Sequence, residues 1–330
     1  MRDFAAPMAP PRSPKTVFDA LADRQLLIVS GKGGVGRTTV AALLGMALAR
    51  RGRRVLVATV GLDDRLAWML GLPTLPEQPV QAARNLYVQR VSPHVCIREY
   101  GALILHSERI AGAVFDSGPM RRVIRTVPGL DDFAILGKVW HEAVRAHSFD
   151  AIVFDGPATG HLRYCLGIPK TILRTLSVGP LPREARLMQD SLEDGNRVQA
   201  VLVGLPDRWP LTELGEMATS LREELHVNIG ALVVNGLWPA GLPELVMPPP
   251  ERDPDGAVAR MFAATNVVRG QAQRQREGVR AWLAGAKIAA TGAVLGLPWR
   301  WQGFTGQGDL EALLAAVDHA DGAAGLELTG

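Results

Sequence analysis

The chain has 330 residues, of which 47% are hydrophobic, 21% are charged and 5% are aromatic, and its formal net charge is +3. This length suits one large or two modest domains with a buried core, and the composition excludes an intrinsically disordered chain. Two cysteines, Cys96 and Cys165, are too few for a disulfide scaffold, and their spacing excludes a CxxC site for zinc or redox chemistry.

The predicted elements alternate between strands and helices along most of the chain. We expect a mobile N-terminal tail over residues 1–20, a single domain over residues 21–320 and a C-terminal tail over residues 321–330. Apolar runs predict strands at residues 26–30, 54–60, 85–91, 151–155, 199–204, 229–235 and just before 298. Helical spacing is found at residues 38–51, 182–193, 212–225, 256–284 and 309–319. A mostly helical stretch over about 95–147 interrupts this alternation, so we expect an α/β fold with a doubly wound, mainly parallel sheet and a helical insertion.

A glycine-rich loop follows the first predicted strand and precedes the first long helix. Its residues are Ser30, Gly31, Lys32, Gly33, Gly34, Val35, Gly36, Arg37, Thr38 and Thr39. Glycines in such a loop let backbone N–H groups point at phosphate oxygens, and the helix N-terminus adds partial positive charge. The spacing matches a Walker A loop with Arg37 in the lysine position, and Thr38 is placed to offer its hydroxyl to Mg²⁺. Residues 31–39 are therefore the candidate phosphate-binding residues of a P-loop.

The same glycines also satisfy the weaker G-x-G-x-x-G pattern of dinucleotide-binding oxidoreductases, through Gly31, Gly33 and Gly36. Such a site requires an acidic residue at the end of the second strand, whereas this strand ends at Gly61. The P-loop is therefore the favoured interpretation and the oxidoreductase a remote one.

A second candidate segment, Asp155-Gly156-Pro157-Ala158-Thr159-Gly160-His161, follows the apolar run at residues 151–154. An Asp at the end of a strand before a Gly/Pro turn is typical of a Walker B and switch II segment, where the carboxylate holds Mg²⁺ through water. Thr38 and Asp155 are thus the candidate metal-binding residues.

These motifs together resemble one family of nucleotide-dependent proteins. Residues 32–39 resemble the deviant Walker A loop of the MinD/ParA/ArsA branch of P-loop ATPases, and residues 155–161 resemble the D-x-x-P-T-G-H signature of the arsenite-pump and tail-anchored-protein-targeting ATPases. The resemblance covers about residues 25–318 and is strongest to the shorter, paired ArsA-like proteins of bacteria. It implies ATP or ADP and Mg²⁺ as ligands, a catalytic role for Asp155, and a signature lysine, Lys32, that reaches the phosphates of a dimer partner. It also implies that Asn235 and Pro298 lie beside the adenine.

The sequence departs from the family pattern at three places. Arg37 replaces the Walker lysine with a longer, planar cation, and Gly61 occupies the position of the switch I Asp that orients the attacking water. Asp63 or Asp64 would take that role only if the loop shifted. There is also no CxxC for the interfacial zinc of the targeting ATPases.

We therefore expect an ATP-binding subunit of a dimeric ATPase whose own hydrolysis is impaired, with a related but different subunit favoured as its partner. The alternative is a fully active homodimer that couples ATP turnover to a conformational switch or to cargo handling. The cargo is not indicated. The basic residues at 50–54 suit a helix C-terminus better than a nucleic-acid site, and no apolar run reaches the ~20 residues that span a bilayer. We expect no nucleic-acid partner, no transmembrane segment and a cytoplasmic location.

Overall fold

The computed structural model describes residues 16–61, 63–105, 109, 129–239, 256–285 and 293–318. Its strands form one eight-stranded sheet in the order β3-β4-β2-β5-β1-β6-β7-β8. Every neighbouring pair is parallel except β3 and β4, which form an antiparallel edge. The strands are β1 (Leu26–Gly31), β2 (Val55–Thr59), β3 (Val80–Ala83), β4 (Leu86–Arg90), β5 (Ala151–Asp155), β6 (Val198–Gly204), β7 (Ile229–Leu237) and β8 (Ala293–Pro298). The predicted mainly parallel α/β sheet is confirmed.

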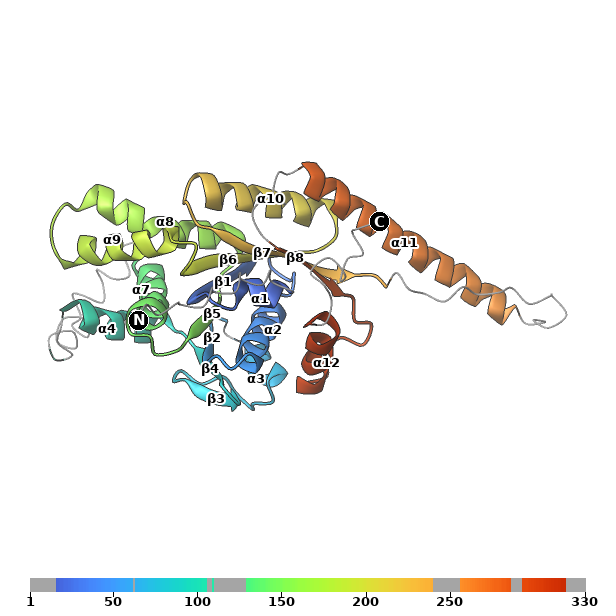
Figure 1. Ribbon diagram of the computed structural model, residues 1–330, viewed down its shortest axis with the longest axis horizontal. Coiled ribbons are helices and arrows are strands. Elements are labelled where there is room, and N and C mark those ends of the chain that lie inside the picture. Colours follow the sequence, from blue (N-terminus) through green and yellow to red (C-terminus); the bar gives the residue numbers. More distant parts are fainter. Residues whose placement is uncertain are drawn as a thin grey trace, which may run out of the picture.

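Helices cover both faces of this sheet (Figure 1). One face carries α1 (Val17–Leu21), α2 (Arg37–Arg50), α3 (Arg65–Met69) and α12 (Gln307–Asp318). The other carries α4 (Pro93–Leu105), α7 (Leu130–Trp140), the short π-helix η1 (His141–Arg145), α8 (Thr159–Thr175), α9 (Pro180–Glu193) and α10 (Arg208–Glu223). Both faces of the sheet are thus covered, as a doubly wound fold requires.

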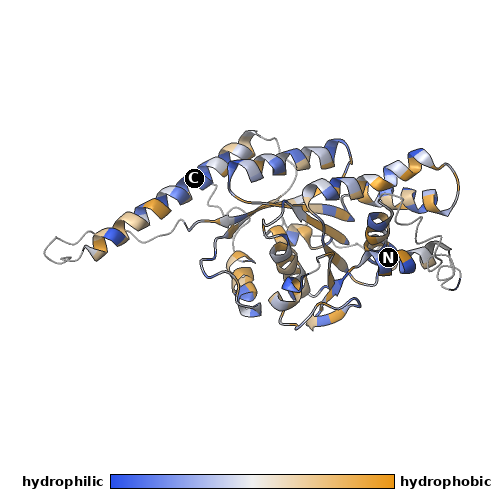
Figure 2. Ribbon diagram, turned by 180° about the vertical axis from the view of Figure 1, so that it is seen from behind, coloured by the Kyte–Doolittle hydropathy of each residue, from blue (hydrophilic) through white to orange (hydrophobic). Residues whose placement is uncertain are grey.

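The alternation of side chains along β1 shows why both faces need a cover. Leu27 and Val29 pack into the cluster under α2, while Leu26 and Ile28 pack into the cluster under α7 and α8. Successive side chains of a strand point to opposite faces, so a strand that is apolar throughout must be buried on both sides. Figure 2 shows apolar residues concentrated in the strands and in the helices that pack on them.

The N-terminal boundary differs from the expected one. Residues 17–20 were expected in a mobile tail, but they belong to α1, which Thr16 caps through its side chain. Phe18 is buried in the core, and the guanidinium of Arg51 lies 5.6 Å from its ring centroid. Arg51 also pairs with Asp19 and Asp318, which joins α1 to the ends of α2 and α12. The rest of the expected tails, residues 1–15 and 321–330, lies outside the described residues.

The expected helical insertion lies between β4 and β5, where α4, α7 and η1 are found. Within this insertion, Gly129 caps α7 with a positive φ of 82°. The sequence did not predict α8, whose glycines and internal Pro169 weaken the helical pattern. Residue 212 is not the start of α10: the Thr212 hydroxyl donates to the Arg208 carbonyl inside a helix that begins one turn earlier.

The longest helix, α11 (Ala257–Gly285), runs outward from the sheet (Figure 1). It is anchored near its C-terminal end, where Val279 packs against Leu211 and Val234. Among the residues that the structure describes, no helix has both the length and the apolar character needed to cross a membrane.

Candidate nucleotide site

The glycine-rich loop connects the C-terminal end of β1 to the N-terminus of α2, in the middle of the sheet. Ligands of open parallel sheets bind outside the C-terminal ends of the strands, so this is where a phosphate site belongs in such a fold. Gly31 lies against β6, where an added Cβ atom would come within 2.2 Å of the Val203 carbonyl oxygen. A side chain at this position would therefore push the loop away from the sheet.

The loop is braced from β7 by Asn235. Its side-chain amide donates a hydrogen bond of 2.8 Å to the carbonyl of Val35. The adjacent Gly36 has a φ of 92°, and a Cβ atom there would lie 2.3 Å from the Asn235 amide nitrogen. Asn235, which the sequence predicts to lie beside the adenine, thus supports the loop in this structure. Pro298, the other residue expected there, ends β8 next to Leu237 of β7.

Asp155 lies at the C-terminal end of β5, and two hydroxyl groups hold its carboxylate. Thr38 donates to its Oδ2 atom over 2.8 Å, and Thr59 donates to the same atom over 3.0 Å. The residue is only 5% exposed, and this burial raises the pKa of its carboxyl, against the opposing effect of the two hydroxyls and of Arg37. Thr59 was missed by the sequence analysis, because nothing near it in the chain indicates which strand pairs with β2.

Arg37 contacts the segment that follows Asp155. Its Nη1 atom donates a hydrogen bond of 2.6 Å to the Gly156 carbonyl. A second bond joins the same two segments, from the Ser30 hydroxyl to the Pro157 carbonyl over 2.9 Å. The side chain in the Walker lysine position therefore ties the glycine loop to the turn after β5.

The loop after β2 contains the residues considered for orienting water. The Gly61 amide donates to the Thr59 hydroxyl over 3.0 Å. Asp64 is held elsewhere, because its Oδ1 atom accepts from Arg90 at 2.6 Å and from the Leu75 amide at 2.9 Å. Asp63 lies close enough to Asp155 to influence the pKa of its carboxyl. The Asp63 carboxylate accepts a hydrogen bond from the Arg65 amide over 3.3 Å, so both of the weaker candidates have partners within this part of the chain.

Lys32 forms an ion pair within its own chain. Its Nζ atom lies 2.7 Å from Oε1 of Glu213 on α10, with exposed side-chain fractions of 57% and 37%. An exposed pair of this kind contributes about 0–1 kcal/mol to stability, so it positions the lysine without locking it. Glu213 was another residue that the sequence analysis missed.

The environment of Asp155 has a measurable consequence for stability. We expect Asp155→Asn to raise the thermal midpoint of the nucleotide-free protein at neutral pH, because the raised pKa means that ionising this buried carboxyl opposes folding. The stability that the protonated Asp155 carboxyl contributes is fully present below its ordinary pKa of 3.8. This stability is lost as the pH rises through the raised pKa of the folded state. Asn keeps an oxygen for both threonine hydroxyls and carries no charge.

Thermal unfolding of both proteins from about pH 4 to about pH 8 checks this expectation. The midpoint difference in favour of Asp155→Asn should grow with pH. A variant that is less stable than the original protein at neutral pH would contradict it.

Comparison with known proteins supplies independent information about the chain. Residues 24–181 match the family model described as anion-transporting ATPase. ATPase BagA of Mycobacterium tuberculosis is 28% identical over 228 residues, which span 66% of each chain. The arsenical pump-driving ATPase of Escherichia coli is 27% identical over 66% of this chain and 36% of its own length. ATPase GET3 of Podospora anserina is 26% identical over 59% of this chain and 56% of its own length.

The chain thus spans slightly less than two thirds of the length of its mycobacterial relative. The matched family region contains the glycine loop, Asp155 and the segment up to His161, but not Glu213, Asn235 or Pro298. The sheet, with its glycine loop after a central strand, has the architecture of a P-loop nucleoside triphosphatase. Residues 24–181 thus match the anion-transporting ATPase family, in agreement with the resemblance of the sequence motifs to ArsA-like proteins.

Proposed function

We propose that this chain is the ATP-binding subunit of a dimeric ATPase, and that its own hydrolytic site is impaired. The observation that carries the proposal is the 2.6 Å hydrogen bond from Arg37 to the Gly156 carbonyl. In a Walker A loop the lysine directs its charge at the phosphates. Here the guanidinium of Arg37 is instead occupied by a contact with the protein backbone. We further propose that residues 21–320 act as one P-loop unit, since all eight described strands belong to one sheet. We also propose that the protein works in the cytoplasm.

The residues present fit a magnesium nucleotide. Thr38 and Asp155 offer oxygen atoms alone, which is the donor type that Mg²⁺ prefers, and the Thr38 hydroxyl can donate to Asp155 while its lone pair faces a cation. These two residues would hold the ion, Asp155 through water, and the ion would neutralise phosphate charge. The loop amides and the N-terminus of α2 would bind the phosphates, and Asn235 and Pro298 would lie near the base. The names of the relatives as ATPases support ATP as the ligand.

Two features support impaired hydrolysis. Phosphoryl transfer depends on positioning the reacting groups and on stabilising their charge. The two positions that differ from the family pattern, 37 and 61, serve these two purposes. Arg37 is held by the turn after β5, and Gly61 has no side chain with which to orient water. Loss of one positioning group of this kind commonly costs about 10²–10³-fold in rate.

Lys32 supports the dimer. Its ammonium is exposed and pairs with Glu213, so in the free chain it is not committed to the chain's own phosphate loop. We propose that it completes the site of a related subunit, and that the assembled pair hydrolyses ATP even though this chain alone does so slowly.

The test is to measure Mg·ATP binding and ATP turnover by the purified chain, alone and mixed with a related subunit that has an intact Walker lysine. We expect binding by the chain alone, turnover by the mixture, and a mass in the mixture equal to that of a heterodimer. Asp155→Asn is the control, because it should lose the magnesium-dependent part of binding. Rapid turnover by a homodimer of this chain would instead favour the fully active alternative.

A further inference from the structure

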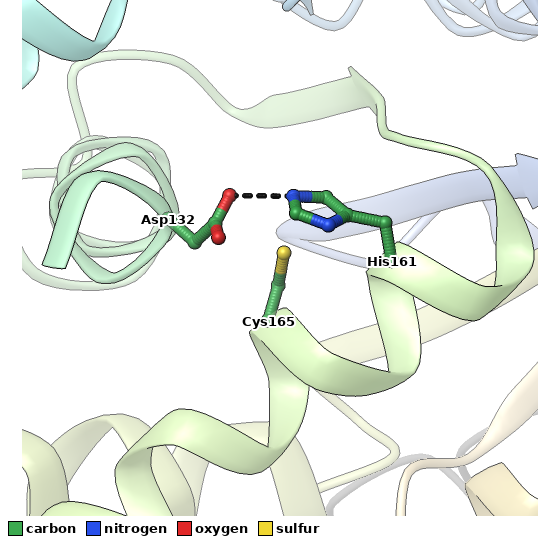
Figure 3. Close-up of side chains that lie close together, drawn as sticks. All are labelled: Asp132, His161 and Cys165. Carbon is green, nitrogen blue, oxygen red and sulfur yellow. Dashed lines mark hydrogen bonds and ion pairs between the residues drawn. The ribbon is translucent and has the colours of Figure 1, made fainter. Parts of the chain in front are cut away.

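Three side chains of different chemistry converge between α7 and α8, outside the nucleotide site (Figure 3). Asp132 comes from the first turn of α7, and His161 and Cys165 lie one turn apart on α8. The His161 Nε2 atom lies 2.8 Å from Oδ1 of Asp132, and the Cys165 thiol lies beside this pair. One ligand atom from each residue lies within 4.8 Å of the other two.

We propose that Asp132, His161 and Cys165 form a binding site for a divalent cation of the Zn²⁺ class. Imidazole nitrogen, thiolate sulfur and carboxylate oxygen are the three donor types that Zn²⁺ uses in proteins. The hydrogen bond that now joins His161 to Asp132 would be replaced when a cation binds between the three groups. Binding would release the thiol proton to solvent and form metal–ligand bonds.

The distances require only a small adjustment. Metal–ligand bonds of about 2.0–2.3 Å in a tetrahedral arrangement place neighbouring ligand atoms about 3.4–3.6 Å apart. The His161–Asp132 pair must therefore open slightly from 2.8 Å, while the other two separations already lie within 4.8 Å. The side chain of His161 is 53% exposed, so an ion can reach the site from solvent.

The remaining coordination position also has space. A cavity of about 150 Å³ adjoins the three residues, lined on its other sides mainly by apolar groups that include Phe154 and Pro157. This volume exceeds the ~30 Å³ of one water molecule in the liquid, so a water or a small exogenous ligand fits beside the ion. Three protein ligands with one open position is the pattern of a zinc site that exchanges its fourth ligand.

A bound ion at this cluster would link two helices. It would join the first turn of α7, in the helical insertion, to the first turns of α8. Pro157, which lines the same cavity, follows Asp155 and Gly156 in the turn held by Arg37. The site is nevertheless chemically distinct from the proposed magnesium site, because a thiolate and an imidazole favour a softer ion than Mg²⁺.

The test uses Co²⁺ as a spectroscopic substitute for Zn²⁺, with the full chain free of nucleotide and of histidine tags and with its thiols reduced. We expect one Co²⁺ to bind per chain with a thiolate-to-cobalt charge-transfer band, Zn²⁺ to remove this band, and excess Mg²⁺ to leave it unchanged. Cys165→Ser should abolish the band. His161→Gln and Asp132→Asn should each weaken Co²⁺ binding at least about tenfold.

Cys96→Ala is the matched control, because it removes the other cysteine, which is buried on α4. It should keep both the band and the affinity. Thermal unfolding identifies any variant that fails to fold, and the exposed position of His161 keeps His161→Gln available if Cys165→Ser does not fold. Absence of the band in the original protein, or its loss in Cys96→Ala alone, would overturn the proposal. Unchanged affinity in folded His161→Gln and Asp132→Asn would overturn it as well.

Discussion

Changing Arg37→Lys and Gly61→Asp together is expected to raise ATP turnover by this chain about 10²–10³-fold. Lysine places a compact charge under the phosphates and removes the guanidinium that bonds to the Gly156 carbonyl. Asp at position 61 supplies a carboxylate to orient water. A Cβ atom there would lie 3.3 Å from the Thr59 hydroxyl, so the added side chain needs a shift of only a few tenths of an ångström. Steady-state phosphate release at saturating Mg·ATP measures the gain.

Arg37→Lys with Gly61→Asn is the matched control, since Asn has the size of Asp without its charge. It should recover only the part of the gain that comes from lysine. The single variants should each fall well short of the double, because groups that act on one transition state are not additive. If the unmodified chain already turns over ATP as fast as the double variant, its site is not impaired.

Changing Lys32→Ala is expected to reduce turnover by the complex with a related active subunit on the order of 10³-fold, as loss of a cation supplied across an interface does. The same change should leave nucleotide binding and thermal unfolding of this chain alone unaltered. Lys32 is exposed, and its pairing with Glu213 contributes little to stability. Turnover assays of the mixed complex, with a melting curve of the free chain, separate the two effects.

Glu213→Gln provides the control for this experiment. It removes the ion-pair partner but keeps Lys32, so the complex should retain full turnover. Equal loss in Lys32→Ala and Glu213→Gln would mean that the ion pair itself, and not the lysine, supports the partner. No loss in Lys32→Ala would remove the reason to expect a phosphate contact across the interface.

The sequence was sufficient to predict those structural elements that depend on residues close together in the chain. The strand, the glycine loop and the helix over residues 26–50 follow from an apolar run, from glycines and from helical spacing, and Asp155 is recognisable as the end of an apolar strand. The parallel sheet followed from the alternation of strands and helices. The local pattern did not predict α8, because this helix contains Pro169 and two glycines. It forms because one of its faces is buried in the core.

Contacts between distant residues were decided only by the tertiary structure. The order β2-β5-β1 brings Thr59 and Thr38 to the same carboxylate oxygen of Asp155, although these residues are about a hundred positions away from it in the chain. The packing of α10 gives Lys32 its partner Glu213, and the packing of α7 on α8 brings Asp132 to His161 and Cys165. Motifs and periodicity indicate whether a segment can form a helix, a strand or a phosphate loop. Which segments pack together depends on burying the apolar surface of the whole chain, and a local pattern does not contain that information. The sequence by itself therefore indicated the resemblance to ArsA-like ATPases and the phosphate loop, while the fold decided which side chains hold Asp155, Arg37 and Lys32.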